Sequence, residues 1–517
     1  MRGRTGSSRA LRRERRASAN EAAIARRGLT GLGGHSARGV FWTVSGQWGS
    51  QVLRLLSIVV LARLLTPDDY GLMAMVWAIT GFVATVGSLG LSEAVVQKQQ
   101  LTHAQTSALF WLNTALGLLL TGLVAACAPL IAAFYGRSEL VEITIALSAT
   151  FLLGGLMVQH QALMLRRLDF RSLAVRTFAA NVVTTAVSIV AAVAGAGYWA
   201  LVLGQLAGST ATLVLTWRAV PWRPSRPARA AGVRELVSFG GGISTFRILD
   251  YAARNADNIL IGRFIGADPL GLYTRAYGLL MLPLTQIHGP VANVVRPTMA
   301  ALWPEPERYR RYYLTALTGL TYLVMPLVVV LAVLATPVVE VLLGRQWLES
   351  AEVFRWLAVA GLLQTVGFTN GWLYATSGRA WAMARWALIS RPVIIVAFVA
   401  GLPFGITGVA IAYAAAQLVL TPLGIARAGR GTPVSLPDVL RICVRPAVVS
   451  ALAGVVAGVT WFLVPDAGAV LALVVRLGLA VVAAGLLVLA WPSARREVWG
   501  IATKFLGARR KKAAATP

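Results

Sequence analysis

The chain has 517 residues and a formal net charge of +28, yet 57% of its residues are hydrophobic and only 13% are charged. Water-soluble domains carry about 25% charged residues, so this composition excludes an ordinary soluble enzyme. Lipid can cover so much apolar surface, and helices satisfy their own backbone groups within it. We therefore predict an all-α membrane protein, since the alternating ten-residue segments of a β-barrel are absent.

Residues 1–38 hold ten arginines and no apolar run, which predicts a disordered, basic cytoplasmic arm rather than a cleavable signal peptide. Stretches long and apolar enough to cross a bilayer then follow. The first six are residues 39–62, 70–92, 107–128, 143–165, 172–194 and 198–217. We expect them to form an N-terminal six-helix bundle over residues 39–217.

An arginine-rich cytoplasmic linker is predicted at residues 218–235. Beyond it, a second six-helix bundle is expected over residues 236–426, with spans at 236–262, 270–295, 312–335, 353–377, 381–402 and 406–426. The region 427–491 adds two transmembrane helices, at 446–464 and 469–491, and a basic cytoplasmic tail covers 492–517. The prediction is thus about 14 transmembrane helices.

The connections between these stretches alternate in charge. If the N-terminus is cytoplasmic, the inner segments hold 36 Lys and Arg residues, and the outer segments hold only Arg63, Arg137, Arg263 and Arg345. Cytoplasmic loops of membrane proteins are enriched in Lys and Arg. We therefore expect a multi-pass protein of the inner or plasma membrane, with both termini in the cytoplasm.

The two sets of six stretches are related by an internal repeat with an offset of 200 residues. Charged and glycine positions recur at this offset, namely Arg54 and Arg254, Arg63 and Arg263, Asp68 and Asp268, and Gly71 and Gly271. Repeats with an even number of helices keep the same orientation in the membrane, so we expect a pseudo-two-fold axis along the membrane normal. Such halves enclose a central cavity and can rock between inward-open and outward-open states.

The seventh predicted span carries charges along one helical face. These are Arg247, Asp250, Arg254 and Asp257, with Asn258 beside them. Opposite charges at such spacings can pair along a helix, which would make a neutral polar seam between packed helices. The alternative is the hydrophilic wall of a cavity, because charges inside a bilayer face protein or water. Since Arg54 holds the repeat position of Arg254, the two are expected to face each other.

A series of short sequence motifs points to a known family. The motifs lie at residues 257–277, 282–286, 296–297 and 307–312. Their sequence resembles that of the polysaccharide flippases of the multidrug/oligosaccharidyl-lipid/polysaccharide exporter superfamily, in particular the colanic-acid and teichuronic-acid exporters. The resemblance implies alternating-access transport of a lipid-linked oligosaccharide, usually on undecaprenyl diphosphate, from the cytoplasmic to the outer leaflet for cell-surface polysaccharide synthesis. The implied partners are this polyprenyl-diphosphate-linked glycan, membrane lipid, and a polysaccharide polymerase and glycosyltransferases.

Given this resemblance, the arginines inside the predicted bundles become candidate ligands of the diphosphate. A guanidinium donates parallel hydrogen bonds to phosphate and keeps its charge. The candidate substrate-binding residues are Arg54, Arg247, Arg254, Arg275 and Arg391. The candidate polar cavity residues are Asp250, Asp257 and Asn258. The two carboxylates would either hold arginines in place or couple transport to a proton or a sodium ion.

Two other functions stay open on the sequence. A small-molecule or drug antiporter of the same superfamily would share the architecture, although the two extra helices and the arginines argue against it. A membrane-embedded glycosyltransferase would need catalytic groups on a sizeable outer loop, and the predicted outer loops are short, so we expect no enzyme activity. The cysteines and histidines lack metal-ligand spacing, so no metal or cofactor is expected. The basic termini have no nucleic-acid-binding motif.

Overall fold

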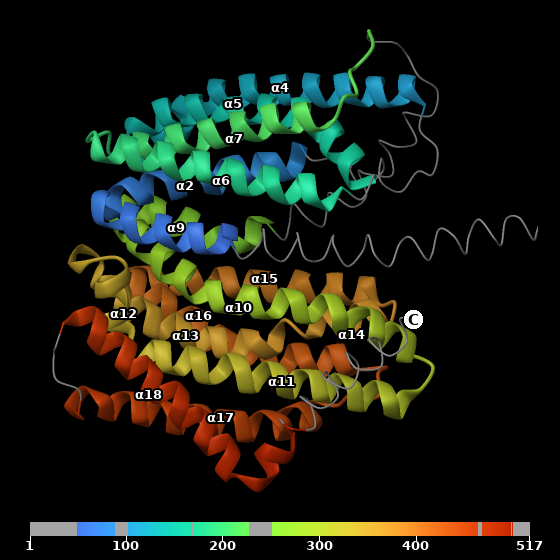
Figure 1. Ribbon diagram of the computed structural model, residues 1–517, viewed down its shortest axis with the longest axis vertical. Helices are drawn as coiled ribbons and strands as arrows, with labels where there is room; N and C mark the ends of the chain where they lie inside the picture. The colour runs from blue at the N-terminus through green and yellow to red at the C-terminus, as the bar shows by residue number, and fades with distance from the viewer. Residues whose placement is uncertain are drawn as a thin grey trace, which may run out of the picture.

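In the computed structural model, residues 49–87, 102–166, 169–226, 251–463, 468–497 and 499 are described, and within these ranges all regular secondary structure is helical (Figure 1). The predicted arm at residues 1–38, the second half of the linker (227–235) and most of the tail lie outside the described residues. So do two of the candidate site residues, Arg247 and Asp250.

The N-terminal half begins with a helix over residues 49–64. It continues with α2 (Pro67–Gly87), α4 (His103–Tyr135), α5 (Glu139–Arg166), α6 (Phe170–Val193) and α7 (Trp199–Ala219). A capping box begins α4, because the Thr102 hydroxyl accepts from the Gln105 backbone and the Gln105 side chain accepts from the Thr102 N–H. Helices α4 and α5 pack together, as do α6 and α7, and α5 joins the two pairs by packing on α7.

The C-terminal half begins with helical residues 251–254. The elements that follow are α9 (Ala256–Phe264), α10 (Ala267–Leu302), α11 (Pro306–Val333), α12 (Ala335–Leu342), η1 (Arg345–Trp347), α13 (Glu349–Gly367), α14 (Asn370–Thr376), α15 (Ala380–Gly401), η2 (Leu402–Phe404), α16 (Gly405–Gly429), α17 (Leu436–Leu463) and α18 (Ala469–Ala490). Helices α15 and α16 pack as a hairpin around η2, and α17 packs on α11 and α18.

Within the described residues, eight helical stretches are long and apolar enough to cross a membrane. They are His103–Tyr135, Glu139–Arg166, Arg171–Val193, Trp199–Ala219, Pro306–Val333, Ala380–Gly429, Leu436–Leu463 and Ala469–Ala490. Large apolar side chains on these helices remain exposed, for example Leu130, Val190 and Phe462. An exposed apolar surface of this extent is the property of a multi-pass membrane protein.

Several predicted helix ends and continuities are wrong. Helix α4 runs past residue 128 to Tyr135 with Pro129 inside it, and α10 runs past residue 295 to Leu302. The predicted spans 236–262 and 353–377 are interrupted, the first by a bend at Asn255 and the second by a turn between α13 and α14. The predicted and observed ends differ because hydropathy marks only the apolar part of a helix. The helix itself continues until its backbone hydrogen bonds end.

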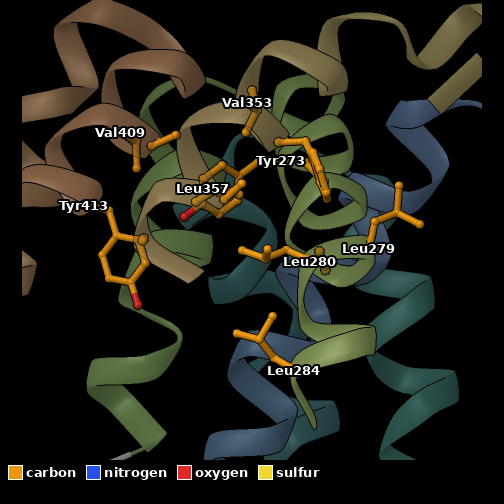
Figure 2. Close-up of a cluster of buried hydrophobic side chains, with 14 of the residues drawn as sticks. Tyr273, Leu279, Leu280, Leu284, Val353, Leu357, Val409 and Tyr413 are labelled. Atoms are coloured by element: carbon orange, nitrogen blue, oxygen red, sulfur yellow. The ribbon is translucent and has the colours of Figure 1, made fainter. Parts of the chain in front are cut away.

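The core of the C-terminal half lies among α10, α13 and α16. Figure 2 shows Tyr273 and Leu280 of α10, Leu357 of α13 and Tyr413 of α16 within one cluster of buried side chains. These side chains fix α10 against the rest of the half. Helix α10 also packs on α2 of the other half. The core therefore fixes the position of α10, which lies at the boundary between the halves.

The two halves lie along the long axis of the molecule, with α4 to α7 toward one end and α17 and α18 at the other (Figure 1). Between them, α2 and α10 touch through glycines. A Cβ atom added to Gly71 would lie 1.8 Å from the Ala267 carbonyl oxygen, and one added to Gly271 would lie 1.9 Å from the Pro67 carbonyl oxygen. Each residue of one contact lies 200 positions from its counterpart in the other, so the helices make the same contact twice.

Candidate functional site

A cavity of about 340 Å³ lies where the two halves meet. Its walls come from the helix over residues 49–64, from α2, from residues 251–258 and from α10, with Leu343 added after α12. It is therefore enclosed by both copies of the internal repeat. Of the eight candidate site residues, the cavity brings together Arg54, Arg254, Arg275, Asp257 and Asn258.

The lining of this cavity repeats with the offset found in the sequence. Five pairs of lining residues lie 200 positions apart, namely Arg54 and Arg254, Ile58 and Asn258, Ala74 and Thr274, Trp77 and Tyr277, and Ala78 and Gly278. Equivalent positions of the two halves thus face one space. Arg54 and Arg254 are identical, whereas the side chains of the other four pairs differ. The cavity is thus symmetric in backbone position and only partly symmetric in chemistry.

Positive charge is concentrated in the cavity. Arg275 lies over the ring of buried Tyr70, with 3.9 Å between the guanidinium carbon and the ring centroid, a cation–π arrangement. Its Nε forms no hydrogen bond with any described residue. Arg54 is close enough to Arg275 to repel it electrostatically. Two like charges at the wall of a low-dielectric cavity favour the binding of an anion between them.

The carboxylate of Asp257 is held by its own surroundings. It is 6% exposed and accepts hydrogen bonds from the Tyr273 hydroxyl at 3.1 Å and from the Asn258 backbone N–H at 2.8 Å. The tyrosine belongs to α10. Asp257 therefore links α9 to the helix that carries Arg275.

The remaining described candidate, Arg391 of α15, does not line this cavity. It lies within electrostatic range of the Tyr413 hydroxyl, as do Asp257 and Arg254. That hydroxyl accepts hydrogen bonds from the amide groups of Gln364, at 2.6 Å, and Gln417, at 3.0 Å. The arginine thus lies near a polar cluster on α13 and α16 and outside the cavity lining. Arg247 and Asp250 lie outside the described residues.

A clasp of hydrogen bonds, made by Gln346 and Trp347, joins the halves near Leu343 of the cavity wall. The Gln346 amide donates to the carbonyl oxygens of Ala62 and Leu65, at 2.7 and 3.0 Å, and the indole of Trp347 donates to the same Ala62 carbonyl at 2.8 Å. These carbonyls end the first helix, where they have no intrahelical partner. No sequence pattern predicts this clasp, because glutamine and tryptophan occur near helix ends for many reasons. It lies on the side predicted to face outward.

Near the opposite end, the described contact between the two halves is slighter. The Gln286 amide donates to the Gln51 side chain at 2.8 Å. Both residues lie on helices that line the cavity, toward the side where the predicted cytoplasmic connections begin. The described residues thus join the halves more firmly at the predicted outer end than at the inner one.

Comparison with known proteins gives a family match and several relatives. A family model described as "Polysaccharide biosynthesis protein" matches residues 60–352. The chain is 28% identical over 344 residues to the teichuronic acid biosynthesis protein TuaB of Bacillus subtilis, covering 66% of this chain and 71% of the relative. It is 25% identical over 335 residues to the lipopolysaccharide biosynthesis protein WzxC of Escherichia coli, covering 63% of this chain and 67% of the relative.

Two solved structures share the fold. One is the lipid II flippase MurJ in an inward closed conformation, with a TM-score of 0.70 and 12% identity, covering 87% of this chain and 98% of that one. The other is an inward-facing multidrug resistance transporter of the MATE family, with a TM-score of 0.60 and 17% identity, covering 76% of this chain and 95% of that one. At these identities the likeness concerns the fold alone.

Proposed function

Because the chain belongs to the polysaccharide biosynthesis protein family, we propose that it moves a lipid-linked oligosaccharide across the membrane for the synthesis of a cell-surface polysaccharide. The lipid carrier is a polyprenyl diphosphate such as undecaprenyl diphosphate, and the direction is from the cytoplasmic to the outer leaflet. Two relatives are named for teichuronic acid and lipopolysaccharide biosynthesis, and one protein of the same fold is named as a lipid II flippase. The polymerase and glycosyltransferases of the same polysaccharide are the proposed partners.

In this proposal, 14 transmembrane helices form two six-helix bundles around a pseudo-two-fold axis, plus two C-terminal helices. The reciprocal contacts of Gly71 and Gly271 support it, because a two-fold axis between α2 and α10 generates each contact from the other. The five residue pairs that line the cavity support it in the same way. Both termini are cytoplasmic in this arrangement, which places the clasp of Gln346 and Trp347 on the outer side.

The observation that carries the proposal is the shared cavity of Arg54, Arg254 and Arg275. A diphosphate presents several acceptor oxygens, and guanidinium groups bind such oxygens with parallel hydrogen bonds. The nearby carboxylate of Asp257 already accepts two hydrogen bonds within the protein. The arginines therefore have the charge and the geometry to bind the diphosphate, and Asp257 supports the helices that carry them.

In this proposal, transport depends on the difference between the two ends of the cavity, since the halves are joined more firmly at the outer end than at the inner one. The diphosphate enters from the cytoplasmic side, where two described hydrogen bonds join the halves, from Gln286 to Gln51 and from Tyr251 to Trp77. Its charge draws the arginines of the two halves together. This closes the inner end and strains the outer clasp until the halves rock apart on the outer side. A low-dielectric wall strengthens the attraction between phosphate and arginine during this step.

The proposal is tested by reconstituting the full chain in vesicles and measuring the flipping of a fluorescent undecaprenyl diphosphate sugar. We expect Arg54→Ala and Arg254→Ala to reduce the rate at least tenfold, because each removes a charge-assisted contact of about 1.5–3 kcal/mol. The matched control is Arg308→Ala, since Arg308 is exposed and pairs with Glu305 outside the cavity. Wild-type flipping by both cavity variants, at normal protein levels, would overturn the proposal.

A further inference from the structure

A second cavity, of about 540 Å³, lies inside the N-terminal half. Helices α2, α4, α5 and α7 form its walls, and Tyr251 completes it. Its volume falls in the range of about 300–1,000 Å³ that small-molecule sites occupy. Trp77 and Tyr251 line both this cavity and the arginine-lined one. The two cavities are therefore neighbouring compartments that share a wall.

The chemistry of the second cavity differs from that of the first. None of its described lining residues is charged. Hydroxyl and amide groups project from four different helices, namely those of Thr80, Asn113, Thr150 and Gln205. Trp77 supplies an aromatic surface that is 40% exposed. The lining thus combines neutral hydrogen-bonding groups with an aromatic face.

Asn113 indicates that the cavity takes a polar ligand. The residue is 8% exposed, and its Nδ2 has no hydrogen-bond partner among the described residues. A buried donor without a partner is costly and is rare in native proteins. The neighbouring backbone is fixed, since a Cβ added to Gly155 would lie 2.5 Å from the Asn113 carbonyl oxygen. Asn113 lines the cavity, so a small shift of its side chain toward the cavity would let the unpartnered amide donate to a ligand oxygen.

Tyr251 lies where the two cavities meet. Its hydroxyl donates to the Trp77 carbonyl oxygen at 3.0 Å. A Cβ added to Gly81 would lie 2.0 Å from this hydroxyl, so a larger residue there would displace the tyrosine from its present position. A ligand that occupies both compartments must pass this pair of aromatic side chains.

We propose that the N-terminal cavity binds the sugar next to the diphosphate, and that it selects a neutral hexose or N-acetylhexosamine. This inference rests on the proposed function. A sugar ring carries neutral hydroxyl groups that amides and hydroxyls can bind, and an apolar face that can lie on the Trp77 indole. A phosphate would need the cations that this cavity lacks among its described lining residues, and a lipid chain would leave Asn113 unsatisfied. The diphosphate and the sugar are thus recognised in separate compartments.

The test measures the affinity of the full chain, in lipid nanodiscs, for two probes. One probe is undecaprenyl diphosphate, and the other is undecaprenyl diphosphate bearing one N-acetylglucosamine. We expect the wild-type protein to bind the second probe more tightly. Asn113→Ala and Thr150→Val should each weaken binding of the second probe about five- to tenfold, while the affinity for the first probe stays unchanged. Arg54→Ala should weaken both.

The matched control is Thr321→Val in the C-terminal half. Thr321 is fully buried and its hydroxyl donates within its own helix, to Leu317 and Thr318, so the same chemical change away from the cavity should alter neither affinity. Equal binding of the two probes by the wild type, or equal weakening of both by Asn113→Ala, would overturn the sugar site and leave the proposed function standing. Failure of the wild type to bind undecaprenyl diphosphate would instead count against the proposed function, and the sugar site would fall with it.

Discussion

Replacing Gly71 with alanine should destabilise the junction between the halves. The new Cβ would lie 1.8 Å from the Ala267 carbonyl oxygen, whereas ordinary contacts of this kind begin at 3.4 Å. Because both atoms belong to the backbone framework, α2 and α10 must separate locally by about 1.6 Å, the difference between these distances. Overpacking of this kind costs about 1–3 kcal/mol, a considerable part of a stability of about 5–15 kcal/mol.

The assay is thermal unfolding of the purified protein in detergent, with Gly122→Ala as the matched control. Gly122 lies in α4 and has no heavy atom within 4 Å of an added Cβ, so alanine there should be neutral or should stabilise the helix by about 0.5–1 kcal/mol. The double variant Gly71→Ala/Gly271→Ala should cost less than the two single changes together, because the first separation relieves the second clash. A melting temperature of Gly71→Ala at or above that of Gly122→Ala would refute the reasoning.

Three further variants test other contacts. Tyr273→Phe removes the hydroxyl that bonds buried Asp257 and should lower stability by about 1–3 kcal/mol, measured by thermal unfolding; an unchanged melting temperature would contradict this. Trp347→Phe removes one donor to the Ala62 carbonyl and should speed maleimide labelling of a cysteine placed in the cavity, added from the outer side; an unchanged labelling rate would contradict the clasp. Arg137→Ala breaks ion pairs with Asp68 and Glu139, all about one-third exposed, and should cost about 1 kcal/mol, so a loss several times larger would contradict it.

Much of the fold was predictable because the bilayer imposes one strong rule. Each long apolar stretch must be helical, and the described helices overlap every predicted span. The all-α fold, the multi-pass character and the resemblance to polysaccharide exporters are confirmed. The break at Asn255 and the turn between α13 and α14 were not predictable, since hydropathy carries no information about local backbone hydrogen bonds.

The candidate site was predictable in part, through the internal repeat. The offset of 200 residues placed Arg54 and Arg254 at equivalent positions, and both line one cavity. The hydrogen bond between Asp257 and Tyr273 depends on how α9 meets α10 and has no signature in the sequence. The same holds for Asn113, because a single asparagine in an apolar stretch does not reveal which neighbours surround it.

The roles of the candidate residues remain predictions, and one measurement tests them most directly. It is a cryo-electron microscopy structure of the full chain saturated with undecaprenyl diphosphate. We predict density for the diphosphate in the cavity between the halves, with phosphate oxygens about 3 Å from guanidinium nitrogens of at least two of Arg54, Arg254 and Arg275. Density for the diphosphate at another position, with the three arginines out of contact with it, would contradict the account.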